Sequence, residues 1–275
     1  MKVIDMRIRP SIPEFRWYFE GPAPIFSKTG YPVPEVTELD AFMADVKDAG
    51  ITKFVCTGRD MTSLGGPRVA NEFISELEAK YPDTIIGVAG IDPLGGQKAL
   101  DEITHSIKDL GLHGVSMDTF AYQKFPNDPA FYPAYEVCQE LGAPIFTTMG
   151  PLPIGFGKMR YADPLYIDDV AQDFPRLRIV ISHGGFPFTQ EMISVAWRNT
   201  NIYFETSLYR NKPGTELLVK AGNDFLGDKM LYASAFPFAS YRQQLKEFLA
   251  LGYKDEVKEK ILWKNAEAFL GMKLQ

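Results

Sequence analysis

The feature that most constrains this chain is a regular alternation between short apolar segments and segments with helical periodicity. The short segments are rich in Val and Ile, which is typical of parallel strands covered on both faces. The segments between them place apolar residues three and four positions apart, as at Leu39, Phe42 and Val46, which predicts amphipathic helices. We predict eight strands, over residues 3–9, 51–57, 84–91, 112–117, 143–148, 177–182, 202–205 and 230–234.

Each predicted strand is followed by a predicted helix, and this arrangement favours a closed barrel over an open sheet. Eight strand–helix units in a chain of 275 residues predict an α/β fold of the (β/α)8 TIM-barrel type. We therefore expect one TIM-barrel domain over residues 1–275. The predicted helices span residues 37–49, 67–81, 97–110, 129–141, 163–173, 188–197, 214–222 and 240–251, with a last helical region over 255–271.

The composition argues against several classes of partner. The net charge of −6 disfavours a nucleic-acid partner or an anionic membrane surface, and no apolar run approaches the roughly 18 residues of a membrane span. Two cysteines are too few for a disulfide framework or a cysteine zinc site. The chain enters its first strand without a basic and apolar leader, so we predict a cytoplasmic location.

The first predicted strand carries two arginines close to its carboxyl end. Side chains alternate along a strand, so its apolar and charged residues should lie on opposite faces. We expect Ile4, Met6 and Ile8 to face the surrounding helices. Arg7 and Arg9 would then face the barrel axis, near the mouth where such barrels hold their active sites. Guanidinium groups bind carboxylates through two parallel hydrogen bonds, so both arginines are candidate catalytic residues that hold a carboxylate substrate.

Polar residues also end other predicted strands, and we expect them to bind the substrate. Arg59 follows the second strand and Thr148 ends the fifth. Asp118 follows the fourth strand and Glu205 ends the seventh. An alternative is that Asp118, Glu205 and Asp5 pair with the arginines and only hold the barrel together, since buried ionic networks are often structural. Such pairing would lower the pKa of each carboxyl and weaken it as a base.

His183 is the histidine best placed for catalysis. It follows the apolar strand over residues 177–182 and precedes Gly184 and Gly185, where the backbone can approach a ligand closely. The unperturbed pKa of imidazole, near ~6.5, suits proton transfer at neutral pH. We therefore assign His183 the role of acid or base, together with the catalytic arginines.

Two connections are longer than the usual ~2–6 residues of a strand-to-helix loop. The first covers residues 10–36 and contains six aromatic residues, and the second covers residues 149–162. Both follow strands, so both should lie at the mouth of the barrel. We expect them to be lids or part of a subunit interface, and the aromatic loop favours a homo-oligomer because its side chains are hard to bury within one barrel.

Seven short segments, taken together, match the pattern of a known family. They are Ile4-Asp5-x-x-x-x-Pro10, residues 111–117 and 144–150, Ser182-His183-Gly184-Gly185, residues 202–205, Ala233-Ser234-x-Phe236-Pro237 and residues 261–270. In this order and over nearly the whole chain, they resemble the amidohydrolase superfamily, in its amidohydrolase-related (amidohydrolase 2) branch. The resemblance implies a TIM barrel that acts on small carboxylic acids, with a divalent metal held by His-x-His on the first strand.

The departures from this family predict the loss of its metal. The resemblance places Arg7 and Arg9 where the first strand carries its two ligating histidines, and Thr148 where the fifth carries another. Ala235 stands in place of the eighth-strand aspartate, and only the sixth-strand histidine is kept, as His183. A zinc site needs three or four ligands, and two arginines at its centre would repel a dication. We therefore predict neither a metal nor another cofactor.

These observations predict a metal-independent hydrolase or lactonase that acts on a small organic carboxylic acid. The arginines would hold the carboxylate or stabilise developing negative charge, and His183 would move the proton. The alternatives are a decarboxylase or lyase of the same family, a non-catalytic descendant that binds a carboxylate, and an enzyme that keeps a metal on Asp5, His183 and other acids. The expected partner is a small-molecule carboxylate or lactone.

Overall fold

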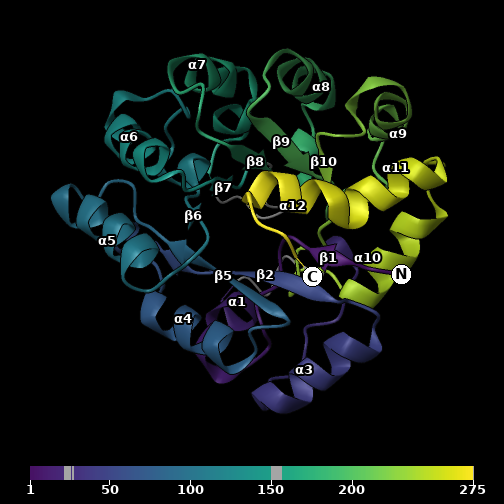
Figure 1. Cartoon of the computed structure of the whole chain (residues 1–275), viewed down its shortest axis with the longest axis horizontal. Helices are drawn as coiled ribbons and strands as arrows, with labels where there is room; N and C mark the ends of the chain where they lie inside the picture. The colour runs from purple at the N-terminus through teal and green to yellow at the C-terminus, as the bar shows by residue number, and fades with distance from the viewer. Residues whose placement is uncertain (22–25, 27, 150–156, 275) are drawn as a thin grey trace.

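Eight parallel strands form one curved sheet, and helices surround it on the outside (Figure 1). The computed structural model describes residues 1–21, 26, 28–149 and 157–274. Neighbouring strands follow the order β1-β2-β5-β6-β7-β8-β9-β10, and each of these pairs is parallel. The strands are β1 (Ile4–Asp5), β2 (Lys53–Thr57), β5 (Ile85–Gly90), β6 (Val115–Ser116), β7 (Ile145–Thr147), β8 (Ile179–Ile181), β9 (Ile202–Glu205) and β10 (Met230–Leu231).

Backbone contacts join the two ends of this sheet and close it into a barrel. Met6 N donates a hydrogen bond to Tyr232 O at 2.9 Å, and Arg9 N donates one to Phe236 O at 3.2 Å. Ile8 and Phe236 form a parallel bridge. The predicted (β/α)8 TIM barrel is confirmed.

A helix follows each barrel strand, as the periodicity predicts. Two more helices, α11 (Asp255–Glu259) and α12 (Asn265–Leu270), end the chain. α12 lies across the end of the barrel at which the strands begin (Figure 1), and its Phe269 packs against Phe146 inside the barrel. The helices that follow the strands are α3 (Leu39–Asp48), α4 (Asn71–Lys80), α5 (Gln97–Lys108), α6 (Tyr132–Leu141), α7 (Leu165–Asp173), α8 (Thr189–Arg198), α9 (Glu216–Ala221) and α10 (Tyr241–Ala250).

The strands carry two apolar layers, one inside the barrel and one between the sheet and the helices. In β2, Val55 belongs to the inner layer, whereas its neighbours Phe54 and Cys56 belong to the outer one, as alternation along a strand requires. The inner layer fills the barrel above α12 and leaves the polar residues to the mouth. Its other strand residues include Ile4, Met6, Ile86, Val88, Phe146, Val180 and Leu231.

The first strand departs from the predicted alternation. Ile4 and Met6 pack inside the barrel, whereas Ile8 packs in the outer layer, so the prediction that all three face the helices was wrong. The reason is a bend at Met6, next to which the Asp5 carboxylate accepts a hydrogen bond from Arg7 N at 3.0 Å. This local bond interrupts the strand and shifts the alternation by one residue. The side chain of Arg7 consequently reaches the mouth.

A short hairpin interrupts the connection between β2 and α4. β3 (Arg59–Asp60) pairs in antiparallel fashion with β4 (Arg68–Val69), so α4 begins at Asn71 rather than at residue 67 as predicted. The hairpin turn contains Gly65 in the left-handed region, with a φ of 65°, and such a turn ends the helical pattern. Arg59 therefore lies in the hairpin, beyond the last residue of β2, Thr57.

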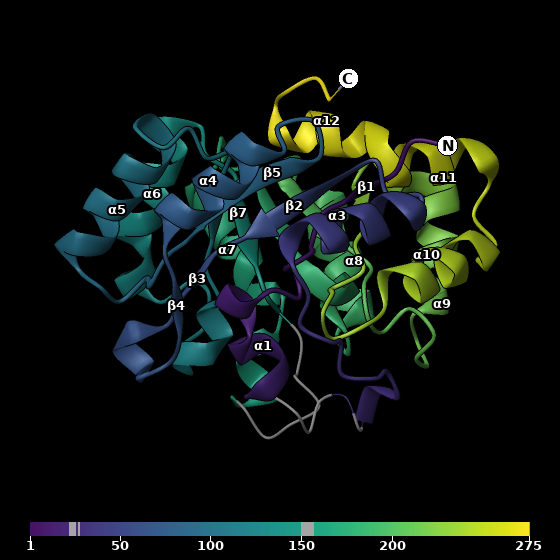
Figure 2. The ribbon, with the colours of Figure 1, turned by 90° about the horizontal axis from the view of Figure 1, so that it is seen from below.

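The aromatic loop, residues 10–36, places its helix α1 (Trp17–Glu20) at the end of the barrel opposite α12 (Figure 2). Phe15, Tyr18 and Phe19 in this loop are buried. The Tyr18 ring lies 4.6 Å from the guanidinium carbon of Arg9, so this part of the loop lies at the mouth, and the role as lid or subunit interface stays a prediction. In the second long loop, residues 150–156 lie outside the described residues.

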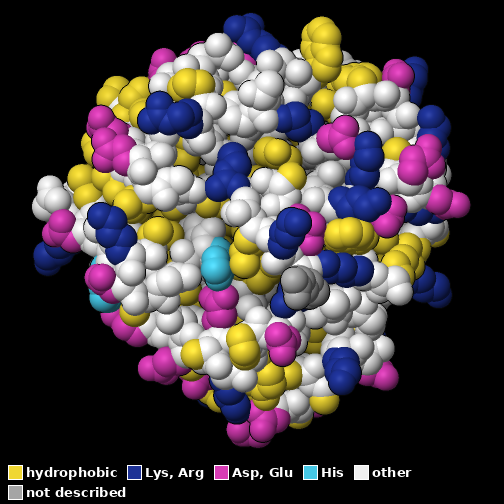
Figure 3. Space-filling view, in the orientation of Figure 1, with side chains coloured by type: hydrophobic (Ala, Val, Ile, Leu, Met, Phe, Trp, Pro, Cys, Tyr) yellow, Lys and Arg dark blue, Asp and Glu magenta, His cyan; other side chains and the backbone are white. Residues whose placement is uncertain are grey.

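Basic and acidic side chains are interspersed over the face that carries α12 (Figure 3). None of the helices in the described part of the chain combines the length and the apolar character that a membrane crossing requires. The cytoplasmic location and the homo-oligomer stay predictions.

The Asp5 carboxylate joins β1 to the segment after β10. Its Oδ1 atom accepts a hydrogen bond from Ser234 N at 3.0 Å as well as the bond from Arg7 N. The Oδ2 atom is buried and has no hydrogen-bond partner among the described residues. Burial raises the pKa of Asp5 from 3.8 to about 7, although the hydrogen bonds from Ser234 and Arg7 act in the opposite direction.

We predict that Asp5→Asn stabilises the protein at about pH 8 and has little effect at about pH 4. Between the unfolded pKa and the folded pKa of Asp5, the folded state holds a proton that the unfolded state has lost, so this group's contribution to stability is lost as pH rises through that window. Asn keeps an acceptor oxygen for both backbone N–H groups and cannot ionise. Urea unfolding at several pH values measures the difference, and a variant with the same pH dependence as the parent would contradict the assignment.

Candidate active site

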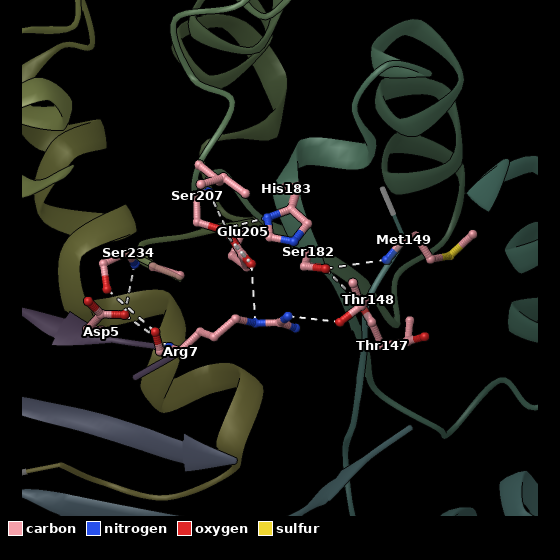
Figure 4. Close-up of polar contacts among 12 residues, drawn as sticks. Asp5, Arg7, Thr147, Thr148, Met149, Ser182, His183, Glu205, Ser207 and Ser234 are labelled. Atoms are coloured by element: carbon pink, nitrogen blue, oxygen red, sulfur yellow. Dashed lines mark hydrogen bonds and ion pairs between the residues drawn. The ribbon is translucent and has the colours of Figure 1, made fainter. Parts of the chain in front are cut away.

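The candidate active site lies at the mouth, where Figure 4 shows a polar network of Arg7, Thr148, His183, Glu205 and Ser207. Arg7 extends from the end of β1, and its Nε atom lies 3.6 Å from Oε1 of Glu205 at the end of β9. Arg7 Nη1 donates a hydrogen bond to Thr148 Oγ1 at 2.9 Å. Arg59 forms an ion pair with Asp118. The sequence therefore identified residues that the fold does bring together.

Two of the three arginines at the mouth have an acidic partner. Burial lowers the pKa of Arg7 to about 10, while Glu205 raises it and Arg9 lowers it further. Burial also lowers the pKa of Arg59 to about 10. Both guanidinium groups remain charged at neutral pH, so Arg7–Glu205 and Arg59–Asp118 are ion pairs. Each pair links the ends of different strands. This is what we expect if Glu205 and Asp118 pair with the arginines to hold the barrel together.

Arg9 differs from the other two arginines. Its side chain is only 2% exposed, and its Nε atom donates a hydrogen bond to the backbone oxygen of Thr57 at 3.3 Å. The Nη2 atom is buried without a hydrogen-bond partner, and no carboxylate in the described part of the chain pairs with this guanidinium. Glu205 and Asp118 thus neutralise two of three positive charges. A buried cation without a counter-charge is costly, so the mouth should attract an anion.

In the described structure, the Asp5 carboxylate does not pair with any of these guanidinium groups. Its Oδ1 atom is used by the backbone N–H groups of Arg7 and Ser234. The alternative in which Asp5 pairs with an arginine, or holds a metal together with His183, is therefore not supported by its hydrogen bonds. Its role is to fix the backbone that carries Arg7.

His183 follows β8 in a strained backbone conformation, with a φ of 62°, which non-glycine residues rarely adopt. Its Nδ1 atom lies 2.8 Å from Oγ of Ser207. The Ser207 hydroxyl donates to Oε1 of Glu205 at 3.0 Å, and Ser207 N donates to Oε2 at 2.6 Å. Figure 4 shows His183, Glu205 and Arg7 directed toward one another.

This chain of hydrogen bonds assigns the proton on the His183 ring. The Glu205 carboxylate only accepts hydrogen bonds, so the Ser207 hydroxyl gives its single proton to Glu205. The Ser207 oxygen must then accept a hydrogen bond from Nδ1–H of His183. The Nε2 atom is left with its lone pair, free to accept a hydrogen bond from a ligand.

The pKa of His183 also differs from the unperturbed imidazole value of ~6.5 that the sequence analysis assumed. Burial lowers it to about 4; Arg7 and Arg9 lower it as well, while Glu205 raises it. His183 is therefore neutral at pH 7. A neutral imidazole with an unprotonated Nε2 acts as a base or hydrogen-bond acceptor rather than as an acid.

Two residues of this site were missed by the sequence analysis. Ser207 lies two positions after Glu205, and this spacing along an extended segment could have placed it on the same face. Tyr18 was recognised only as one of several aromatic residues in its loop. Its ring lies 4.6 Å from the guanidinium carbon of Arg9 and 5.5 Å from that of Arg59, and sequence alone gives no such pairing.

Comparison with known proteins identifies the family. The sequence profile of the amidohydrolase family matches residues 4–272. The chain belongs to the amidohydrolase family. Gamma-resorcylate decarboxylase from Polaromonas sp. (strain JS666) is 23% identical over 242 residues, which are 73% of this chain and 74% of that protein.

Two solved structures share the fold over nearly the whole chain. The first is an uncharacterized TIM-barrel protein, Bb4693 from Bordetella bronchiseptica, which is 31% identical, with a TM-score of 0.88 over 98% of this chain and 99% of that one. The second is a dihydroxybenzoic acid decarboxylase from Polaromonas sp. JS666 with bound manganese and the inhibitor 2-nitroresorcinol. It is 18% identical, with a TM-score of 0.73 over 98% of this chain and 97% of that one.

The prediction of a hydrolase or lactonase was wrong. The Polaromonas relatives named above are decarboxylases, which agrees with the alternative of a decarboxylase or lyase. The residue types at the mouth could not separate the two, because both reactions need a site for a small carboxylic acid.

The manganese in one relative raises the question of whether this mouth fits a divalent cation. Among the described residues, no group of three or more His, Cys, Asp or Glu side chains could hold a metal ion. In addition to burial, the positive charges of Arg7 and Arg9 lower the pKa of His183, so both guanidinium groups lie close to this ring. They would repel a dication. Glu205 already bonds Ser207 and pairs with Arg7. The described residues of this mouth therefore do not fit a divalent metal ion.

We predict that Ser207→Ala shifts the tautomer of His183. Without the Ser207 oxygen, Nδ1–H loses its acceptor, and the Nε2–H form gains population. NMR of protein with 15N-labelled histidine measures this directly, and the chain has only three histidines to assign. Ser182→Ala is the matched control, because the Ser182 hydroxyl donates to Thr147 O and should leave the tautomer unchanged. An unchanged tautomer in Ser207→Ala would contradict the assignment.

Proposed function

We propose that this chain is a lyase that removes CO2 from a small organic carboxylic acid without a metal ion. The observation that carries the proposal is the buried guanidinium of Arg9, which lacks a carboxylate partner in the described part of the chain. A buried cation needs an anion, and a carboxylic acid substrate supplies one. The decarboxylase relatives support the type of reaction.

Decarboxylation breaks the bond between the carboxylate carbon and its neighbour. The electron pair of that bond stays on the neighbouring carbon, which takes a proton from solvent water, and CO2 leaves as a neutral molecule. Because negative charge moves off the carboxylate, a cation accelerates this step only where it stabilises the charge in its new position. We therefore infer that Arg9, which holds the negative charge of the bound acid, also lies near the atoms that receive this charge as CO2 leaves, while Arg7 and Arg59 orient the substrate.

His183 complements the arginines in this proposal. Its neutral ring offers the Nε2 lone pair to a substrate hydroxyl, and the bonds through Ser207 and Glu205 hold the ring in place. Thr148 and Asp118 restrict Arg7 and Arg59 in the same way. The substrate would thus meet three fixed cations and one fixed hydrogen-bond acceptor.

A second candidate function is binding of a carboxylic acid without turnover. The observation in its favour is Ala235, which is buried in the segment after β10 and has no group that can transfer a proton. In the resemblance to the family, an aspartate stands at this position. The two candidates make the same prediction for binding and differ in whether CO2 is released.

We predict that decarboxylation of an acid bound at the mouth does not depend on a divalent metal. The protein is treated with a chelator, its metal content is measured by elemental analysis, and CO2 release is followed with a panel of aromatic and unsaturated carboxylic acids. Unchanged turnover after chelation supports the proposal. Turnover that disappears with the chelator and returns with manganese would contradict it, and binding without CO2 release would favour the second candidate.

We predict that Arg7→Met and Arg9→Met have opposite effects on stability and binding. Arg7→Met leaves the buried Glu205 without its cation, which should cost about 3–5 kcal/mol of unfolding free energy. Arg9→Met leaves no acid unpaired in the described structure, so stability should change little while affinity for the acid falls roughly tenfold or more. Urea unfolding and isothermal titration calorimetry measure the two quantities.

Arg210→Met is the matched control for these variants. Arg210 is also buried, but its guanidinium donates to the backbone oxygens of Gln244 and Ala233 at 2.6 and 2.7 Å and packs on Phe248 of α10. Its loss should lower stability and leave affinity unchanged. In steady-state kinetics, Arg9→Met should lower kcat more than it raises KM. If Arg9→Met kept full affinity, the arginines would be structural and the proposal would fail.

A further inference from the structure

The aromatic loop contributes one buried hydroxyl that the proposed function does not use. Tyr18 lies in α1 and is 1% exposed. Its ring packs against the guanidinium groups of Arg9 and Arg59. Its hydroxyl is buried and has no hydrogen-bond partner among the described residues. Most buried tyrosine hydroxyls are hydrogen-bonded, so this one requires an explanation.

The charged side chains around this hydroxyl cannot accept a hydrogen bond from it. Arginine has only donors, and the hydroxyl of Tyr18 lies close enough to Arg7 and Arg59 to affect both electrostatically. Arg9 Nη2 is a second buried donor without a partner in the same region. Tyr18 and Arg9 thus each carry a buried donor without a partner at the mouth, where Nε of Arg7 and Nε of Arg59 also lack a hydrogen-bond partner among the described residues. One anion with two acceptor oxygens would satisfy the Tyr18 hydroxyl and Arg9 Nη2.

We propose that Tyr18 is a ligand-binding residue, whose hydroxyl donates a hydrogen bond to the same anion that Arg9 holds. This inference rests on the proposed function, because it requires an anionic ligand at Arg9. It assigns the aromatic loop a chemical role in addition to its place at the mouth. It also narrows the ligand to acids that present two acceptor oxygens to the side of the mouth formed by β1 and α1.

Tyr18→Phe tests this role, because Phe keeps the ring against Arg9 and removes only the hydroxyl. The probe is 2,6-dihydroxybenzoate, a small aromatic acid, in isothermal titration calorimetry with the full chain. A hydrogen bond to a charged group is stronger than one between neutral groups, so we expect affinity to fall roughly tenfold or more. The melting temperature of the ligand-free protein should stay the same or rise, because a buried hydroxyl without a partner is removed.

Tyr135→Phe is the matched control. The Tyr135 hydroxyl is also buried, but it donates a hydrogen bond to Pro126 O at 2.9 Å. This variant should lower the melting temperature and leave affinity for the probe unchanged. If the Tyr18 hydroxyl were merely structural, Tyr18→Phe would likewise leave the affinity for the probe unchanged.

The outcomes separate this inference from the proposed function. If Arg9→Met weakens binding of the probe and Tyr18→Phe does not, the role of Tyr18 is overturned and the anion site stands. If the parent protein does not bind the probe, or Arg9→Met leaves binding intact, both are overturned. Weaker binding in Tyr18→Phe and in Arg9→Met, with normal binding in Tyr135→Phe, supports both.

Discussion

The mouth of this barrel depends on an electrostatic imbalance, in which three guanidinium groups face two carboxylates among the described residues. Glu205 and Asp118 each pair with one arginine. The Arg9 guanidinium contacts the carbonyl of Thr57 and the ring of Tyr18, and neither group carries a full negative charge. The free energy of keeping such a cation away from water is offset when an anion binds beside it. The site is therefore suited to anions, and its remaining polar groups are arranged around that charge.

The same imbalance separates this chain from the manganese-bound relative with the same fold. A guanidinium resembles a bound metal ion in supplying fixed positive charge, and it can stabilise negative charge that develops on a substrate. It differs in that it does not coordinate water and lower the pKa of that water, as a metal ion does. In the proposed reaction, loss of CO2 needs no activated water. Because function resides in the site rather than in the fold, the barrel itself does not decide the question.

The bend after β1 sets the position of the arginine network. Without it, strict alternation would turn Arg7 away from the axis whenever Met6 faced inward. The Asp5 carboxylate stabilises the bend through Arg7 N and ties it to Ser234 across the barrel closure. A buried acid thus acts on the mouth through the backbone, without touching a ligand. Arg7 can then reach both Glu205 and Thr148.

The sequence by itself determined the barrel, because eight apolar strands alternating with amphipathic helices have few other ways to bury their surfaces. It also predicted Arg7, Arg9 and His183 at the mouth, since each lies at or just after the carboxyl end of a predicted strand. The tertiary structure decided which partner each one has: it left Arg9 without an acid, bonded His183 to Ser207, and brought Tyr18 over the mouth from the aromatic loop. Arg9 bonds Thr57 and His183 bonds Ser207 across the ends of different strands, and the direction of Arg7 depends on a one-residue shift at a bend that no periodic pattern encodes.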